Sequence, residues 1–152
     1  MTNGYALLER KPTAAELLAL RKSVGWHLYD PITIEAGLVN SLYGICAVAD
    51  SRVVGAARVV GDGCTVFYVQ DVIVHPDHQG QGIGAAIMER VMAYIGEHAC
   101  QGAVVGLMSA LGKEGFYERY GFWKRPTEQV GHGMIQYWGF EAASSPASPQ
   151  AE

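Results

Sequence analysis

The stretch FYVQDVIVHPDHQGQGIGAAIMERVMAYI, residues Phe67 to Ile95, reads as a strand, a turn and a helix. Its first part, Phe67 to Val74, is rich in β-branched and aromatic residues, which favour strands. The strand ends at His75-Pro76-Asp77, because proline has no N–H group for the hydrogen bonds of a sheet. Apolar residues then recur at helical spacing, at Ile83, Ile87, Val91 and Ile95. The sequence therefore predicts a strand–turn–helix unit around which the rest of the chain is organised.

A glycine-rich loop, Gln79-Gly80-Gln81-Gly82-Ile83-Gly84-Ala85, joins the strand to the helix. Glycine accepts positive φ angles and lets a ligand approach the backbone closely. At the start of a helix, unpaired N–H groups and the helix dipole favour an anion. Three glycines at alternate positions therefore predict a site for phosphate or pyrophosphate, rather than a turn that merely uses glycine.

Three kinds of phosphate-binding loop compete for this pattern. A nucleoside-triphosphate loop requires Lys-Ser/Thr after its last glycine, but Gly84 is followed by two alanines. The dinucleotide pattern Gly-x-Gly-x-x-Ala is met by Gly80, Gly82 and Ala85. It lacks its context, because the region from Gly102 to Ser109 has no acidic residue to bind a ribose, and too little chain remains for further βαβ units.

The third kind fits at every position. Gln79, Gly82 and Gly84 match Arg/Gln-x-x-Gly-x-Gly/Ala, so the loop resembles the acyl-CoA loop of the GCN5-related N-acetyltransferase (GNAT) superfamily. A second segment, Phe116-Tyr117-Glu118-Arg119-Tyr120-Gly121-Phe122, is similar to the Phe/Leu-Tyr-Glu-Lys-x-Gly-Phe segment of that family. The resemblance covers roughly Tyr5 to Phe140, and these two motifs carry its specificity.

Composition bounds the class of protein. The chain has 152 residues, of which 49% are hydrophobic, so we expect one domain (residues 1–141) followed by a disordered tail (142–152, AASSPASPQAE). The net charge of −4 argues against nucleic acid or an anionic membrane as the main partner. No apolar run reaches the ~20 residues that a membrane span requires, and the start has no signal-peptide pattern. We therefore expect a cytoplasmic, bacterial enzyme.

Cysteines and histidines offer no metal pattern. Cys46, Cys64 and Cys100 are odd in number and widely spaced, which predicts buried, reduced thiols. His75 and His78 flank a proline but have no third ligand at a matching spacing, so we interpret them as exposed turn residues and expect no metal.

The remaining elements complete an α+β pattern. Before the central unit we expect a strand at Tyr5–Glu9, a helix capped by Thr13 and stopped by Gly25, a helix at about Thr33–Leu42, and strands at Ile45–Ala49 and Arg52–Val60. After it we expect a short buried strand at Gly102–Met108 and a short helix at Lys113–Tyr120. A last pair of strands is expected at Phe122–Trp123 and Met134–Phe140. The resemblance implies a GNAT-like mixed, mostly antiparallel twisted sheet, flanked by helices, whose two central parallel strands splay apart. The pantetheine arm of CoA would enter that gap like a short extra strand.

The resemblance also implies an activity. It is transfer of the acetyl group from acetyl-CoA directly to the primary amine of a small molecule, in a ternary complex without an acyl-enzyme. Tyr117 matches the tyrosine that protonates the departing thiolate in the family, and a phenol with a pKa of about 10 is protonated at neutral pH. Packing against the sheet is the alternative role for Tyr117. A CoA-binding sensor or interaction protein without turnover is the alternative from another class, and a homodimer is compatible with the resemblance.

Asp71 is an acid within an otherwise apolar strand, which is costly unless the carboxylate is paired or used. It could bind the ammonium of the acceptor or relay its proton through water. It could equally be the structural partner of Arg58 on a neighbouring strand. Both roles stay open, and so does the identity of the general base.

The expected ligand contacts follow from the resemblance. For acetyl-CoA they are Val72, Ile73, Val74, Gln79, Gly80, Gln81, Gly82, Ile83, Gly84, Ala85, Ser109, Lys113, Phe116 and Tyr117. Ser109 or Lys113 would replace an asparagine that many relatives carry after the second central strand. For the acceptor they are Trp26, Tyr29, Asp71, His132 and Met134. Arylalkylamines, amino sugars, polyamines, antibiotics and peptide N-termini all stay open, with aromatic amines favoured by Trp26 and Tyr29.

Overall fold

The computed structural model describes residues 4–140, so the predicted tail lies outside the described residues. Its elements are β1 (Ala6–Leu8), α1 (Ala14–Ser23), α2 (Pro31–Val39), β2 (Tyr43–Ala49), β3 (Arg52–Gly61), β4 (Val66–Val74), the 3₁₀ helix η1 (Pro76–His78), α3 (Ile83–His98), β5 (Val104–Gly106) and α4 (Glu114–Glu118). The five strands form one sheet in sequence order, antiparallel except for the parallel pair β4–β5. The α+β class is confirmed. Within residues 4–140, no helix is long and apolar enough to cross a membrane.

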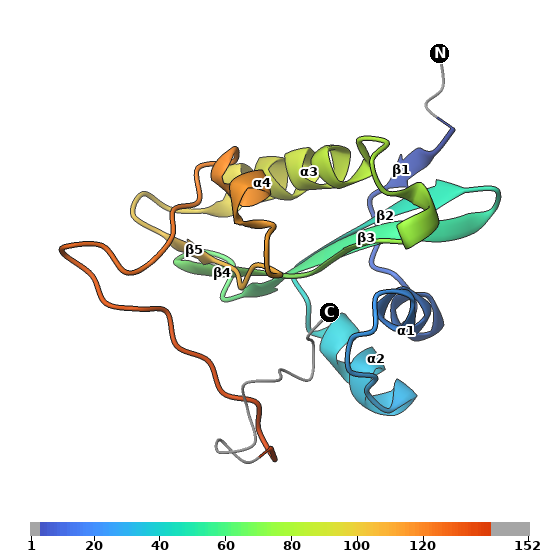
Figure 1. Cartoon of the computed structure of the whole chain (residues 1–152), viewed down its shortest axis with the longest axis horizontal. Helices are drawn as coiled ribbons and strands as arrows, with labels where there is room; N and C mark the ends of the chain where they lie inside the picture. The colour runs from blue at the N-terminus through green and yellow to red at the C-terminus, as the bar shows by residue number, and fades with distance from the viewer. Residues whose placement is uncertain (1–3, 141–152) are drawn as a thin grey trace.

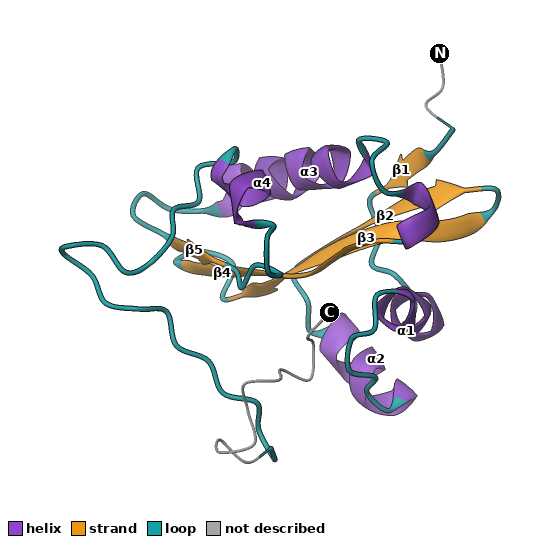
Figure 2. Ribbon diagram, in the orientation of Figure 1, coloured by secondary structure: helices purple, strands orange, loops and turns teal. Residues whose placement is uncertain are grey.

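Helices cover both faces of the sheet. In Figures 1 and 2, α3 and α4 lie on one face, and α1 and α2 lie on the other. The predicted apolar stripe of α3 is buried, at Ile83, Ile87, Val91 and Ile95. Gly55 on β3 allows this close packing, because a Cβ there would lie 3.1 Å from side-chain carbons of Ile83 and Ile87. On the opposite face, Leu17, Leu20, Ile34 and Leu38 form a second core with Ala56 and Ile73.

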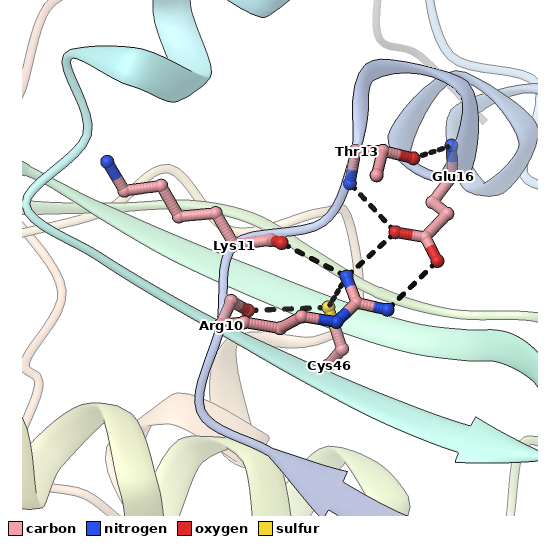
Figure 3. A network of polar contacts seen from close by, with 5 residues as sticks. All are labelled: Arg10, Lys11, Thr13, Glu16 and Cys46. Atoms are coloured by element: carbon pink, nitrogen blue, oxygen red, sulfur yellow. Dashed lines mark hydrogen bonds and ion pairs between the residues drawn. The ribbon is translucent and has the colours of Figure 1, made fainter.

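The start of α1 confirms the predicted cap (Figure 3). The Thr13 hydroxyl accepts from the Glu16 N–H at 3.1 Å, and Glu16 accepts from the Thr13 N–H at 2.8 Å. Both oxygens of Glu16 also accept from the Arg10 guanidinium, at 2.8 and 3.0 Å. The Arg10 hydrogen bonds, with those from Thr13, lower the pKa of Glu16 to about 2. This network therefore stabilises the fold above the ordinary carboxyl pKa and loses its contribution as the pH falls towards 2.

Strand β4 carries a bulge at the middle of the sheet. Its register with β3 shifts between the pairs Arg58–Gln70 and Ala56–Ile73, so two residues of β4, Asp71 and Val72, oppose one residue of β3. Asp71 has φ = 56°, a left-handed conformation that is uncommon outside glycine. The bulge withdraws backbone groups from the ladder and bends the strand.

The two parallel strands separate after a short paired stretch. β5 pairs with β4 only through Val104, Val105 and Gly106, opposite Val66, Phe67 and Tyr68. The predicted gap between the strands is thus present, since β4 continues to Val74. β5 itself is shorter than predicted and is not buried: Val104 is 64% exposed. The reason is that β5 is an edge strand of the sheet.

The predicted last pair of strands is wrong. Residues 121–140 contain no strand, and the orange-to-red chain in Figure 1 leaves α4 and runs outside the sheet. Trp123 and Trp138, which were expected in these strands, are 66% and 90% exposed. An apolar, β-prone sequence forms a strand only beside a partner strand, and β5 has none on its outer side within the described chain.

Two other predictions need correction. The second helix runs from Pro31 to Val39. It begins earlier than predicted because Asp30 caps it, accepting from the Ile32 N–H at 2.9 Å.

Cys46 is buried as predicted, and burial raises the pKa of its thiol to about 11. Cys64 and Cys100 are exposed, because each lies in a connection next to an element rather than inside one.

Candidate active site

A cleft of about 860 Å³ opens beside β4 at the point where β5 ends. Its walls come from the loop after α1, from β4, from the glycine loop and the start of α3, from the chain between β5 and α4, and from α4 and the segment after it. The lining residues are Val24, Trp26, Tyr68, Val69, Gln70, Asp71, Val72, Ile73, Val74, His78, Gln79, Gly80, Gly82, Ile83, Gly84, Ala85, Leu107, Met108, Ser109, Ala110, Leu111, Lys113, Phe116, Tyr117, Arg119 and Tyr137. The cleft therefore draws on segments from both faces of the sheet.

The glycine loop presents backbone donors to the cleft. Gly80 and Gly82 have φ of 77° and 84°, and Gly82 is the N-cap of α3. No side chain caps this helix end, and its first recorded turn bond runs from the Ala86 N–H to the Gly82 carbonyl at 3.1 Å. A Cβ on Gly80 or Gly82 would meet nothing within 4 Å, so the space before the loop is open. Unpaired N–H groups, the positive end of the helix dipole and open space together fit a phosphate.

Neighbouring side chains fix the loop in place. The Gln79 amide donates to the Val74 carbonyl at 2.9 Å, which ties the loop to the end of β4. Phe116 of α4 lies 3.6 Å from the position of a Cβ on Gly84, and the Tyr120 hydroxyl donates to the Ala85 carbonyl at 3.3 Å. Gln79 was expected to contact CoA; the residue lines the cleft, and that contact stays a prediction.

The edge of β4 is bare along the cleft. After Tyr68 the strand has no β5 partner, and every residue from Val69 to Val74 lines the cleft. An extended ligand that carries amide groups can hydrogen bond with such an edge as an added strand would.

Tyr117 reaches the cleft from α4. Its ring meets Phe116 and Phe122 edge-on, with centroids 5.0 and 6.3 Å away. Burial raises the pKa of Tyr117 to about 12, so the phenol carries its proton throughout the neutral range. Within residues 4–140, no hydrogen bond to its hydroxyl is formed. The residue is therefore a protonated donor facing a space where a ligand can lie.

Asp71 is the centre of a buried ion-pair network. One carboxylate oxygen accepts from Arg21, which is fully buried, and the other accepts from Arg58 Nε at 2.8 Å. Arg21 also donates to the His27 carbonyl at 2.8 Å and lies over the ring of Tyr29 at 4.9 Å. The pairing with Arg58 that the sequence left open is thus present. Because both oxygens are taken by guanidinium groups, the geometry supports a structural role for Asp71 rather than that of a free base.

The other expected residues divide into two groups. Trp26, Ser109, Lys113 and Phe116 line the cleft with the loop residues already described. Gln81, Tyr29, His132 and Met134 do not, and the Met134 side chain is 89% exposed. Met134 was expected to begin a strand, and residues 121–140 form none, although Tyr137 further along this segment does line the cleft.

Several cleft residues were missed from the sequence. They are Val24, Tyr68, Leu107, Arg119 and Tyr137. Arg21 was also missed, although it follows Leu17 by four residues and so shares the buried face of α1. A charged residue on an apolar stripe is a readable signal for a buried ion pair. Among residues 4–140, no group of three His, Cys, Asp or Glu side chains could hold a metal ion.

Comparisons with known proteins agree with this geometry. A family model described as "Acetyltransferase (GNAT) domain" matches residues 42–124. An uncharacterized N-acetyltransferase, ycf52, of Pyropia yezoensis is 30% identical over 115 residues, which is 73% of this chain and 65% of that protein. The chain therefore spans about two thirds of the length of this relative.

Two further relatives are informative. The crystal structure of a probable acetyltransferase from methicillin-resistant Staphylococcus aureus has a TM-score of 0.77 at 33% identity, covering 88% of this chain and 99% of the other. Serotonin N-acetyltransferase 2 of rice, Oryza sativa subsp. japonica, is 50% identical over 42 residues, or 28% of this chain and 21% of that enzyme.

Proposed function

Because this chain belongs to the GNAT acetyltransferase family, we propose that it transfers the acetyl group of acetyl-CoA directly to the primary amine of a small molecule. One observation carries the proposal: a helix end without a side-chain cap, a strand edge without a β5 partner and a protonated tyrosine meet in a single cleft. Acetyl-CoA, when bound, supplies an activated thioester.

The cleft suits the parts of acetyl-CoA in order. The N–H groups at the start of α3 would bind the pyrophosphate, and Lys113 and Arg119 add positive charge to the cleft. The bare edge of β4 would bond the amides of the pantetheine arm, and its bulge leaves backbone groups free to orient the acetyl carbonyl. Ser109 lines the cleft after β5, and we propose that it contacts the same arm.

Tyr117 is the proposed general acid. In the transfer, the amine nitrogen forms a bond to the acetyl carbon while the bond from that carbon to sulfur breaks. The sulfur leaves as a thiolate and needs a proton, which the Tyr117 hydroxyl donates. Since burial raises the pKa of this phenol to about 12, the donor is protonated at neutral pH.

The amine must lose a proton before it attacks. Arg21 and Arg58 carry two positive charges against the single negative charge of Asp71, so the wall next to the cleft has a net charge of about +1. A positive wall disfavours a bound ammonium and favours the neutral amine, which is the nucleophile. We therefore propose that the amine loses its proton to water, with Asp71 holding the two arginines in position.

The acceptor wall favours an aromatic monoamine. Trp26, Tyr68, Leu107, Met108 and Tyr137 give the cleft apolar and aromatic surface. Asp71 supplies the only carboxylate among the described lining residues, and it is already paired. A polyamine would thus meet no free anion to bind its additional charges. The short match to a serotonin N-acetyltransferase supports the same class.

This substrate preference can be measured by competition. With tryptamine and spermidine together in one reaction, we expect kcat/KM for tryptamine to exceed that for spermidine by about tenfold or more, a ratio within reach of pocket contacts. Quantifying both N-acetyl products by mass spectrometry gives the ratio directly. Equal or preferential acetylation of spermidine would contradict the aromatic acceptor class.

The acid role of Tyr117 predicts the behaviour of Tyr117→Phe. Removing the hydroxyl should lower kcat by about 100-fold with little change in KM, because the lost interaction exists only as sulfur departs. Tyr94→Phe is the matched control, since the Tyr94 ring stacks on Tyr43 and His98 and the residue does not line the cleft. Full kcat in Tyr117→Phe would show that another group or water protonates the thiolate.

A further inference from the structure

Two exposed thiols face each other at the paired end of the parallel strands, away from the cleft. Cys64 precedes β4, and Cys100 lies between α3 and β5. The Cys100 N–H donates to the Cys64 carbonyl at 3.0 Å, and the neighbouring Cys100 thiol raises the pKa of Cys64. Such a backbone bond holds two Cα atoms about 5–6 Å apart, within the range of natural disulfides of roughly 4.4–6.8 Å.

Rigid surroundings fix this juxtaposition. The Asp62 carboxylate accepts from the N–H groups of Cys64, Thr65 and Val66 at 2.8, 2.8 and 3.0 Å, which locks the turn before β4. On the other side, the Ala99 N–H closes the end of α3 on the Ile95 carbonyl at 2.8 Å. The two cysteines thus extend from two ordered segments that meet at one point.

We propose that Cys64 and Cys100 form a modification site, at which a low-molecular-weight disulfide converts the thiol pair into an intramolecular disulfide. The thiolate of one cysteine attacks the small disulfide, forming a mixed disulfide and releasing one small thiol. The thiolate of the second cysteine attacks the protein sulfur of that mixed disulfide, and the second small thiol departs. Two protein thiols are oxidised, one small disulfide is reduced to two thiols, and two protons leave the cysteines.

The bond would stabilise the fold without entering the active site. It would close a loop that contains all of β4 and α3, which restricts the unfolded chain. Neither cysteine lines the cleft, so turnover by the oxidised protein should be unchanged. The Cys64 thiol has a raised pKa, caused first by the neighbouring Cys100 and also by Asp62, so the exchange should be faster at alkaline pH.

The test is oxidation of the full chain with oxidised glutathione at alkaline pH. We expect the intact mass to fall by two hydrogens with no glutathione retained, and peptide mapping to give a Cys64–Cys100 crosslink. We also expect Tm to rise by about 5–10 °C. The Cys100→Ser variant should instead retain one glutathione on Cys64 and show no rise in Tm.

Other outcomes would overturn the proposal. They are glutathione retained on both cysteines of the unmodified sequence, crosslinks between chains, or a crosslink that leaves Tm unchanged. Because the readouts are mass and Tm, the result is independent of the proposed acetyl transfer.

Discussion

Gly82→Val should raise the KM for acetyl-CoA by about 10- to 100-fold. Gly82 caps α3 with φ = 84°, a conformation that costs a side-chain-bearing residue roughly 1–2 kcal/mol, more if β-branched. A Cβ there would meet no protein atom within 4 Å, so the valine would extend into the space proposed for the pyrophosphate. The loss should therefore fall on binding of the co-substrate rather than on the hydrophobic core.

Steady-state kinetics with acetyl-CoA varied would measure this effect. Gly96→Ala is the matched control: Gly96 lies within α3, and a Cβ there also meets nothing within 4 Å. That variant should retain its KM and gain a few tenths of a kcal/mol of stability or more. An unchanged KM in a folded Gly82→Val protein would remove the phosphate site from this loop.

Asp71→Asn should lower the free energy of unfolding by about 3–5 kcal/mol, the usual range for breaking a buried ion pair. The neutral amide cannot balance two guanidinium groups, of which Arg21 is fully buried. The same change at Asp50, an exposed turn residue with φ = 49°, is the control and should stay within about 0.5 kcal/mol.

Urea unfolding would give the free energies of unfolding of the Asp71→Asn and Asp50→Asn variants. Measuring kcat at a temperature where both variants are folded would then separate a structural role of Asp71 from a role in catalysis. A structural role predicts a large loss of stability. Unchanged stability with a kcat reduced by two or more orders of magnitude would mean that Asp71 acts on the acceptor's proton, and would contradict the network as its main task.

Local patterns predicted the centre of this fold well. The strand, glycine loop and helix from Val66 to His98 follow from β-branched residues, glycine positions and a helical apolar period, all of which act within a few residues. The Thr13 cap is equally local and was equally readable. The position of the glycine loop in the candidate site was therefore predictable from the sequence alone.

Features that depend on distant partners were not predictable in the same way. Trp138 belongs to a β-prone segment, but a strand requires a neighbour, and no local pattern says whether the sheet continues beyond β5. The choice between two roles for Asp71 depended on Arg21, which lies 50 residues earlier in the sequence. The meeting of Cys64 and Cys100 likewise depends on the parallel pairing of β4 with β5.

The most direct test of the central claim is release of CoA, measured by chromatography, when the protein is incubated with acetyl-CoA and a panel of amines. Chromatography avoids thiol dyes, which would react with the exposed Cys64 and Cys100. We predict CoA and an N-acetylated product in equal amounts, with aromatic monoamines turned over fastest. Tight binding of acetyl-CoA with no CoA release from any amine would contradict catalysis and identify the chain as a CoA-binding protein that keeps the GNAT fold.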